Sequence, residues 1–147
     1  MEFDNKIMLG AVFTFLERGK DVTINVKGRS MLPFLVGGRD KVVLTATKSG
    51  LHTGDAVLAE LRPGQYVLHR IIALEGEDVT LMGDGNLRGT EHCKVQDVRG
   101  IVTQYIRPNR TILAADRSLQ RRIRLWRKLL PVRRYLLFLI NLFKLYK

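Results

Sequence analysis

Residues 56–74, AVLAELRPGQYVLHRIIAL, contain two apolar segments separated by a short polar turn. Each segment has the length of a β-strand, and the Arg-Pro-Gly at 62–64 is typical of a turn. The stretch therefore predicts a β-hairpin with strands at 56–61 and 66–74. A histidine, His69, lies in the middle of the second strand, among apolar neighbours.

Similar short strands are expected on both sides of this hairpin. Apolar and polar residues alternate over 21–27, which is typical of a half-buried strand. Many short strands separated by turns predict a mainly β domain, of sandwich or barrel type, with its β core at about 21–107. A short amphipathic helix is expected before this core, at about 4–18. The remaining predicted strands lie at 41–46, 79–82 and 95–106.

Charge is distributed unevenly along the chain, whose net charge is +11. Residues 1–116 carry 15 Lys and Arg against 14 Asp and Glu, whereas residues 117–147 carry 10 Lys and Arg and no acidic residue. We therefore expect a nearly neutral domain over 1–116 and a basic amphipathic helix over 117–147, kinked or restarted at Pro131. Such a basic segment indicates an anionic partner.

Three interpretations of the basic segment remain open. It could lie flat on an anionic membrane, pack on the core as an ordinary C-terminal helix, or bind nucleic acid. We favour the first, as a peripheral protein of the cytoplasmic face, because no stretch reaches the ~20 apolar residues of a spanning helix. Nucleic acid is disfavoured by the dense leucines and phenylalanines. The expected membrane-binding residues are Arg121, Arg122, Trp126, Arg133, Arg134, Tyr135, Phe138 and Phe143.

The segment VKGRSMLP at 26–33 contains a candidate nucleophile, Ser30. Gly28 allows close approach of a ligand to the backbone, and Pro33 stiffens the exit from the turn. A serine on such a turn can point its hydroxyl into a cleft, with neighbouring N–H groups facing a developing oxyanion. Serine is also common in turns that have no function, so this segment alone decides nothing.

His69 supplies the base that a serine nucleophile requires. A serine hydroxyl needs a positioned base to act as a nucleophile, and a neutral imidazole can accept its proton. A carboxylate close to the base would complete the arrangement. The turn Met-Gly-Asp-Gly-Asn at 82–86 offers Asp84, which could orient His69 or pair with Arg70.

Taken in order, these stretches resemble the sequence boxes of the signal peptidase I and LexA-type serine peptidases. The resemblance covers about residues 26–102, and each box is weak alone. The matching segments are GRSMLP at 28–33 for the Ser-Met-x-Pro box, GDAV at 54–57, HRI at 69–71, GDGN at 83–86 and DVRGIV at 97–102.

The resemblance implies a signal peptidase/LexA-like catalytic β domain in which Ser30 attacks the scissile carbonyl. Most bacterial relatives use Lys as the base, and His69 at that position is similar to the endoplasmic-reticulum and archaeal type of signal peptidase. Asp84 is the expected third catalytic residue, and Glu91 is the nearest candidate for a second acid. The oxyanion and substrate residues would be Gly28, Arg29, Met31 and Pro33, supported by Arg70 and Asn86.

The function expected from these residues is a membrane-associated serine endopeptidase that removes a leader or signal segment from a peptide or protein. Two alternatives remain: a non-enzymatic peptide- or membrane-binding module of the same fold, and a self-cleaving LexA-type regulator. We expect no cofactor and no metal, because the adjacent His92 and Cys93 lack the second ligand pair of a zinc site.

Overall fold

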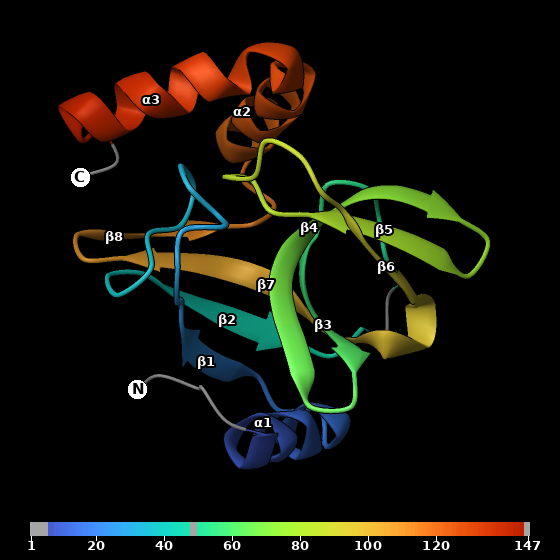
Figure 1. Ribbon diagram of the computed structural model, residues 1–147. Coiled ribbons are helices and arrows are strands. Elements are labelled where there is room, and N and C mark those ends of the chain that lie inside the picture. The colour runs from blue at the N-terminus through green and yellow to red at the C-terminus, as the bar shows by residue number, and fades with distance from the viewer. Residues whose placement is uncertain (1–5, 48–49, 146–147) are drawn as a thin grey trace.

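The hairpin predicted over residues 56–74 is present at the centre of the fold. In the computed structural model, which describes residues 6–47 and 50–145, strand β3 (Ala56–Arg62) pairs antiparallel with β4 (Gln65–Glu75). The mainly β class is confirmed, since eight strands form one antiparallel sheet (Figure 1). The other strands are β1 (Val22–Asn25), β2 (Lys41–Thr45), β5 (Asp78–Met82), β6 (Glu91–Lys94), β7 (Val98–Arg107) and β8 (Arg110–Leu113).

The strand order is β1-β2-β7-β3-β4-β5-β6, with β8 paired to β7. Strands far apart in the sequence therefore lie side by side, and β7 joins the N-terminal strands to the central hairpin. Helix α1 (Lys6–Glu17) lies at one end of the sheet, and the C-terminal helices lie at the opposite end (Figure 1).

Strand β4 is long and changes partners along its length. Residues 65–70 pair with β3, and residues 70–75 pair with β5, with a register shift between Ile71 and Ala73. Such irregularities bend a strand and increase its twist. His69 and Arg70 lie at the point where β4 passes from one partner to the other.

Two apolar clusters fill the interior. The larger one lies between α1, the β1-β2-β7 strands and the C-terminal part of the chain, and includes Leu16, Leu44, Tyr105 and Leu119. The smaller one lies between β3, β4, β5 and the start of β7. The candidate site lies where residues of both clusters meet along β4.

The helical segment predicted over 117–147 restarts at Pro131, as expected, and so forms two helices. Helix α2 (Arg117–Lys128) begins where the Asp116 carboxylate caps the Leu119 N–H at 3.0 Å. A 3₁₀ turn (Leu130–Val132) containing Pro131 follows, and α3 (Arg133–Phe143) then begins. Proline cannot donate the backbone hydrogen bond of a helix interior, so a break there is expected.

Helix α2 is part of the folded body. Its apolar residues Leu119, Ile123 and Trp126 are buried in the larger cluster, whereas Leu125 on the opposite side is exposed. The packed-helix interpretation therefore describes α2. Strands β6 and β8 were not predicted, because the Glu-His-Cys-Lys of β6 is polar and β8 is only four residues long.

Replacing Leu119 by alanine should lower the free energy of unfolding by about 2–5 kcal/mol, because a fully buried leucine leaves a cavity. Leu125→Ala in the same helix is the matched control and should change it by ~0.5 kcal/mol or less. Urea denaturation of both variants measures the difference. Equal stability of the two variants would mean that α2 does not pack on the core.

Candidate functional site

Ser30 lies in a closed loop that begins at the end of β1. The Val26 N–H donates to the Asp40 carbonyl and the Gly38 N–H to the Val26 carbonyl, which ties the two ends of the loop together. A Cβ on Gly37 would lie 2.1 Å from the Gly28 carbonyl oxygen. The backbone at Gly37 therefore packs directly against the backbone at Gly28. This packing holds Ser30 on a rigid support.

The loop at 83–86 packs directly against the Ser30 backbone. The Gly85 N–H donates to the Ser30 carbonyl oxygen at 2.8 Å. A Cβ on Gly83 would lie 2.4 Å from the Ser30 carbonyl oxygen, and one on Gly85 would lie 2.5 Å from that of Arg29. Both glycines are therefore required for this close approach, a role that the sequence alone had not assigned to them.

Ser30 and His69 line the same cleft, which has a volume of about 270 Å³. Because Arg70 pairs with Met82 across the β4-β5 ladder, Gly83 follows at the level of His69. The contact between Gly83 and Ser30 thus brings the serine beside the histidine. The cleft also includes Val26 of the serine loop and residues of β1 and β4.

The carboxylate that contacts His69 is that of Glu91. A Glu91 Oε1 lies against the His69 Nδ1, and the imidazole is almost fully buried. Side chains alternate between the two faces of a strand, and the pairs Ile71–Leu81 and Leu81–Glu91 place Glu91 on the same face as His69. With Nδ1 engaged, Nε2 is the ring nitrogen available to a group in the cleft.

Asp84 is bound to Arg70, not to His69. Its two carboxylate oxygens accept hydrogen bonds from Arg70 Nε at 2.8 Å and Nη2 at 2.6 Å, and both residues are buried. Arg70 Nη1 also donates to the Gly54 carbonyl and to the Tyr105 hydroxyl. Of the two positions expected for Asp84, the contacts agree with pairing to Arg70, and the carboxylate that contacts His69 is that of Glu91, the candidate second acid.

Burial and the neighbouring carboxylate act in opposite directions on the pKa of Arg70. Desolvation alone would lower the pKa of the Arg70 guanidinium, but the adjacent Asp84 carboxylate outweighs it and raises that pKa. Desolvation also raises the pKa of the neighbouring Tyr105 hydroxyl. The Arg70 guanidinium therefore stays charged within the fold, and it also lies over the Phe34 ring at 5.5 Å.

The C-terminal helices hold both loops of the site. The Trp126 indole N–H donates to the Asp84 carbonyl at 2.7 Å, and Arg133 donates to the Asn86 carbonyl at 3.0 Å. On α3, the Asn141 side chain accepts a hydrogen bond from the Arg29 guanidinium at 2.8 Å. None of these contacts was predicted, because they join residues that are far apart in the sequence.

Two residues expected to bind a membrane are therefore interior residues. Trp126 is 7% exposed and Arg133 is 3% exposed, and the Arg133 guanidinium lies over the Trp126 ring. Burial lowers the pKa of Arg133, which the Asp84 carboxylate partly counteracts. The other residues of that set are exposed: Arg121, Arg122, Arg134, Tyr135, Phe138 and Phe143.

The structure offers no metal centre within its described ranges, in which no group of three or more His, Cys, Asp or Glu side chains could hold an ion. His92 lies near the hydroxyls of Thr80 and Thr90. Burial raises the pKa of the Cys93 thiol. Neither residue faces the cleft of Ser30 and His69.

Comparison with known proteins does not assign the chain. No protein-family model matches it, and no curated protein matches it. We therefore infer the function from the residues of the site itself.

Substitution of Asp84 should lower the free energy of unfolding much more than substitution of Glu91. Asp84→Asn leaves the buried Arg70 without its counterion and should lower the free energy of unfolding by roughly 3–5 kcal/mol. Glu91→Gln, at a partly exposed site, should cost ~1 kcal/mol or less in stability. Urea denaturation checks both values. Equal destabilisation by the two substitutions would contradict the division of roles between these carboxylates.

Proposed function

We propose that the protein is a serine endopeptidase in which Ser30 is the nucleophile, His69 the general base and Glu91 the residue that orients His69. The observation that carries this proposal is the joint placement of Ser30 and His69 in one cleft, with Glu91 on the Nδ1 of His69. A nucleophile, a base within the same cleft and a third group that orients the base are the elements of a catalytic triad.

In the proposed reaction, His69 Nε2 takes the proton of the Ser30 hydroxyl as its oxygen attacks the scissile carbonyl. The Ser30 N–H, on the rigid turn, is the donor that stabilises the developing oxyanion. The imidazolium then protonates the leaving amine, and water hydrolyses the acyl-enzyme with His69 again as base. Glu91 stabilises the charged imidazole during both steps.

The substrate we propose is an extended segment of a peptide or protein, such as a leader or signal segment. The cleft runs along β1 and β4, with Ile24, Leu58 and Tyr66 contributing apolar surface. An extended chain can pair with strand backbone while its small or apolar side chains enter such a cleft. This proposal includes the finer fold, a signal peptidase/LexA-like catalytic domain, which the order of the sequence boxes supports.

Ser30→Ala and His69→Ala should each lower kcat/KM for a cleaved peptide by roughly 10⁴-fold or more, with a double mutant little worse than either, because the two residues act as one unit. His52→Ala, at an exposed histidine, is the matched control and should retain full activity.

A fluorophosphonate probe measures the nucleophile directly when the natural substrate is unknown. It should label the native chain and Ser118→Ala equally, and should not label Ser30→Ala. Labelling of Ser30→Ala at the native rate would end the assignment of Ser30, and normal peptide turnover by His69→Ala would end that of His69.

We further propose that α3 binds the surface of an anionic membrane, on its cytoplasmic face. One side of α3 presents Tyr135, Phe138, Leu139 and Leu142 to solvent, and contiguous apolar surface of this kind is typical of an interaction site. Among the described residues, no helix is long and apolar enough to cross a bilayer. A helix lying in the interface, with Arg134 near lipid phosphate, fits these side chains.

Substituting both Phe138 and Leu142 by serine should weaken co-sedimentation with phosphatidylglycerol vesicles more than tenfold, because two apolar side chains lose their burial in lipid. Leu113→Ser is the matched control, since Leu113 is 58% exposed and Leu142 59%. It should leave vesicle binding unchanged. Native-like binding by the double variant would contradict a lipid-facing α3.

A further inference from the structure

A second cavity, of about 650 Å³, lies away from the cleft of Ser30 and His69. It is a partly open cavity that lies between the serine loop, the β7-β8 hairpin and the two C-terminal helices. Small-molecule sites commonly have volumes of ~300–1,000 Å³ and mainly apolar walls. The walls here are of that kind, with side chains from Phe34, Leu125, Trp126, Leu129 and Ile140.

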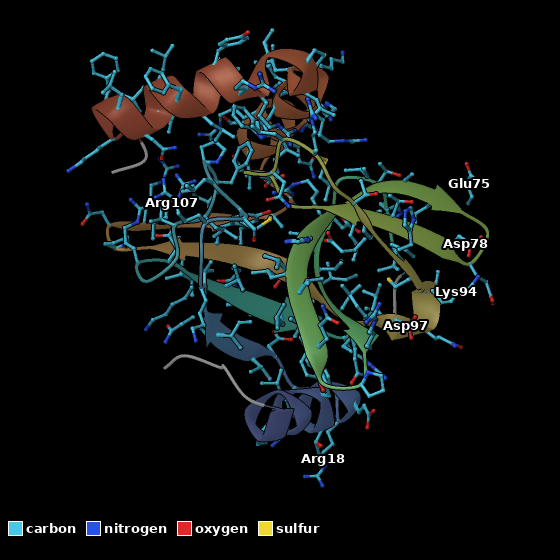
Figure 2. All side chains as sticks on the ribbon, viewed as in Figure 1. Arg18, Glu75, Asp78, Lys94, Asp97 and Arg107 are labelled. Carbon is cyan, nitrogen blue, oxygen red and sulfur yellow. The ribbon has the colours of Figure 1, made fainter. Side chains whose placement is uncertain are left out.

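Four arginines line this mainly apolar cavity: Arg39, Arg107, Arg110 and Arg122. Figure 2 shows Arg107 between the β7-β8 hairpin and α3, on the side of the molecule where the cavity lies. Arg39 is held by the Asp40 carboxylate. In the part of the chain that the structure describes, no carboxylate forms an ion pair with the other three.

Arg107 is partly buried at the cavity and anchored to the serine loop. Its Nη2 donates to the Phe34 carbonyl at 3.0 Å, while its Nε is buried and has no partner among the described residues. Burial lowers the pKa of Arg107; Asp40 counteracts this, and the guanidiniums of Arg122, Arg39 and Arg110 lower it further. Arg107 is thus close enough to the other three arginines of the cavity to be repelled by them, and a bound anion would relieve that repulsion.

We infer that this cavity binds one anionic phospholipid, with its phosphate among the arginines and an acyl chain between α2, α3 and the serine loop. Apolar walls and a cationic rim are complementary to an amphiphile that combines one negative head with a hydrocarbon chain. The inference rests on the proposed membrane association, which would supply the lipid, and is independent of the peptidase activity.

The lipid would also lie next to the groups that hold the site. Trp126, which lines the cavity, donates to the Asp84 carbonyl, and Phe34, also in the cavity wall, lies under Arg70. An acyl chain in the cavity would therefore contact the same side chains that support the serine loop.

The protein contains a single tryptophan, and because Trp126 lines the cavity its fluorescence reports occupancy. Dihexanoyl phosphatidylglycerol, kept below its micelle concentration, should change the emission saturably at one lipid per chain. Dihexanoyl phosphatidylcholine should bind at least tenfold more weakly, and inorganic phosphate should leave the emission unchanged. Equal responses to the two lipids, or a full response to phosphate, would overturn the inference.

Neighbouring arginines of α2 provide a matched pair of variants. Arg122→Gln removes a charged hydrogen-bond donor at the cavity and should weaken the anionic lipid about tenfold. Arg124→Gln, outside the cavity on the same helix and not among the expected membrane-binding residues, should bind as the native chain does. Equal affinities of the two variants, with native-like thermal unfolding, would overturn the assignment of the arginine rim.

The same titration separates this inference from the surface association of α3. The Phe138/Leu142 double variant could lose vesicle binding and keep its Trp126 response to monomeric lipid. That result supports lipid binding in the cavity and not surface association of α3. Vesicle binding without any response to monomeric lipid supports the surface alone and overturns the cavity inference. The chain could instead form a dimer in the absence of lipid. If that dimer shows no Trp126 response to lipid, a second copy of the chain fills the cavity, and this result also overturns the inference.

Discussion

The buried ion pair of Arg70 and Asp84 connects most parts of the structure. Arg70 is fixed on β4, and its guanidinium reaches the Asp84 carboxylate, the start of β3 through Gly54, and β7 through Tyr105. The backbone carbonyl of Asp84 in turn receives the Trp126 indole of α2. A buried pair is not by itself strong evidence of stability, but losing one partner leaves an uncompensated charge. The arrangement of these elements therefore depends on both residues together.

Adjacent residues of β4 have separate roles because a strand alternates its side chains. Arg70 points into the interior, where it holds the loop at 83–86, and His69 points to the other face, where the cleft and Glu91 lie. The face of β4 that carries Arg70 thus fixes the loop at 83–86, whose glycines support Ser30. The opposite face carries His69. Loss of Asp84 would consequently disturb Ser30 through the backbone, without any contact between Asp84 and His69.

Much of this could be predicted from the sequence, and the errors have physical causes. Apolar runs flanking a turn gave the central strands, and the order of short boxes predicted that Ser30 and His69 act together. The sequence favoured Asp84 over Glu91 as the partner of His69, because the polar strand β6 carries no apolar pattern and its register decides the position of Glu91. Once the pairing of β4, β5 and β6 is known, alternation places Glu91 on the face of His69. Asp84 lies beyond the end of β5, in the loop that brings it to Arg70.

The burial of Trp126 and Arg133 was missed for a related reason. Amphipathic periodicity identifies an apolar face but does not say what covers it. Helix α2 buries Leu119 and Trp126 in the core, while α3 uses Leu137 for packing and leaves Phe138 and Leu142 exposed. The segment that would meet a membrane is thus fastened through Arg133 and Asn141 to the loops of the site. Any force that a lipid surface exerts on α3 would reach Arg29, the residue before Ser30, through a single hydrogen bond.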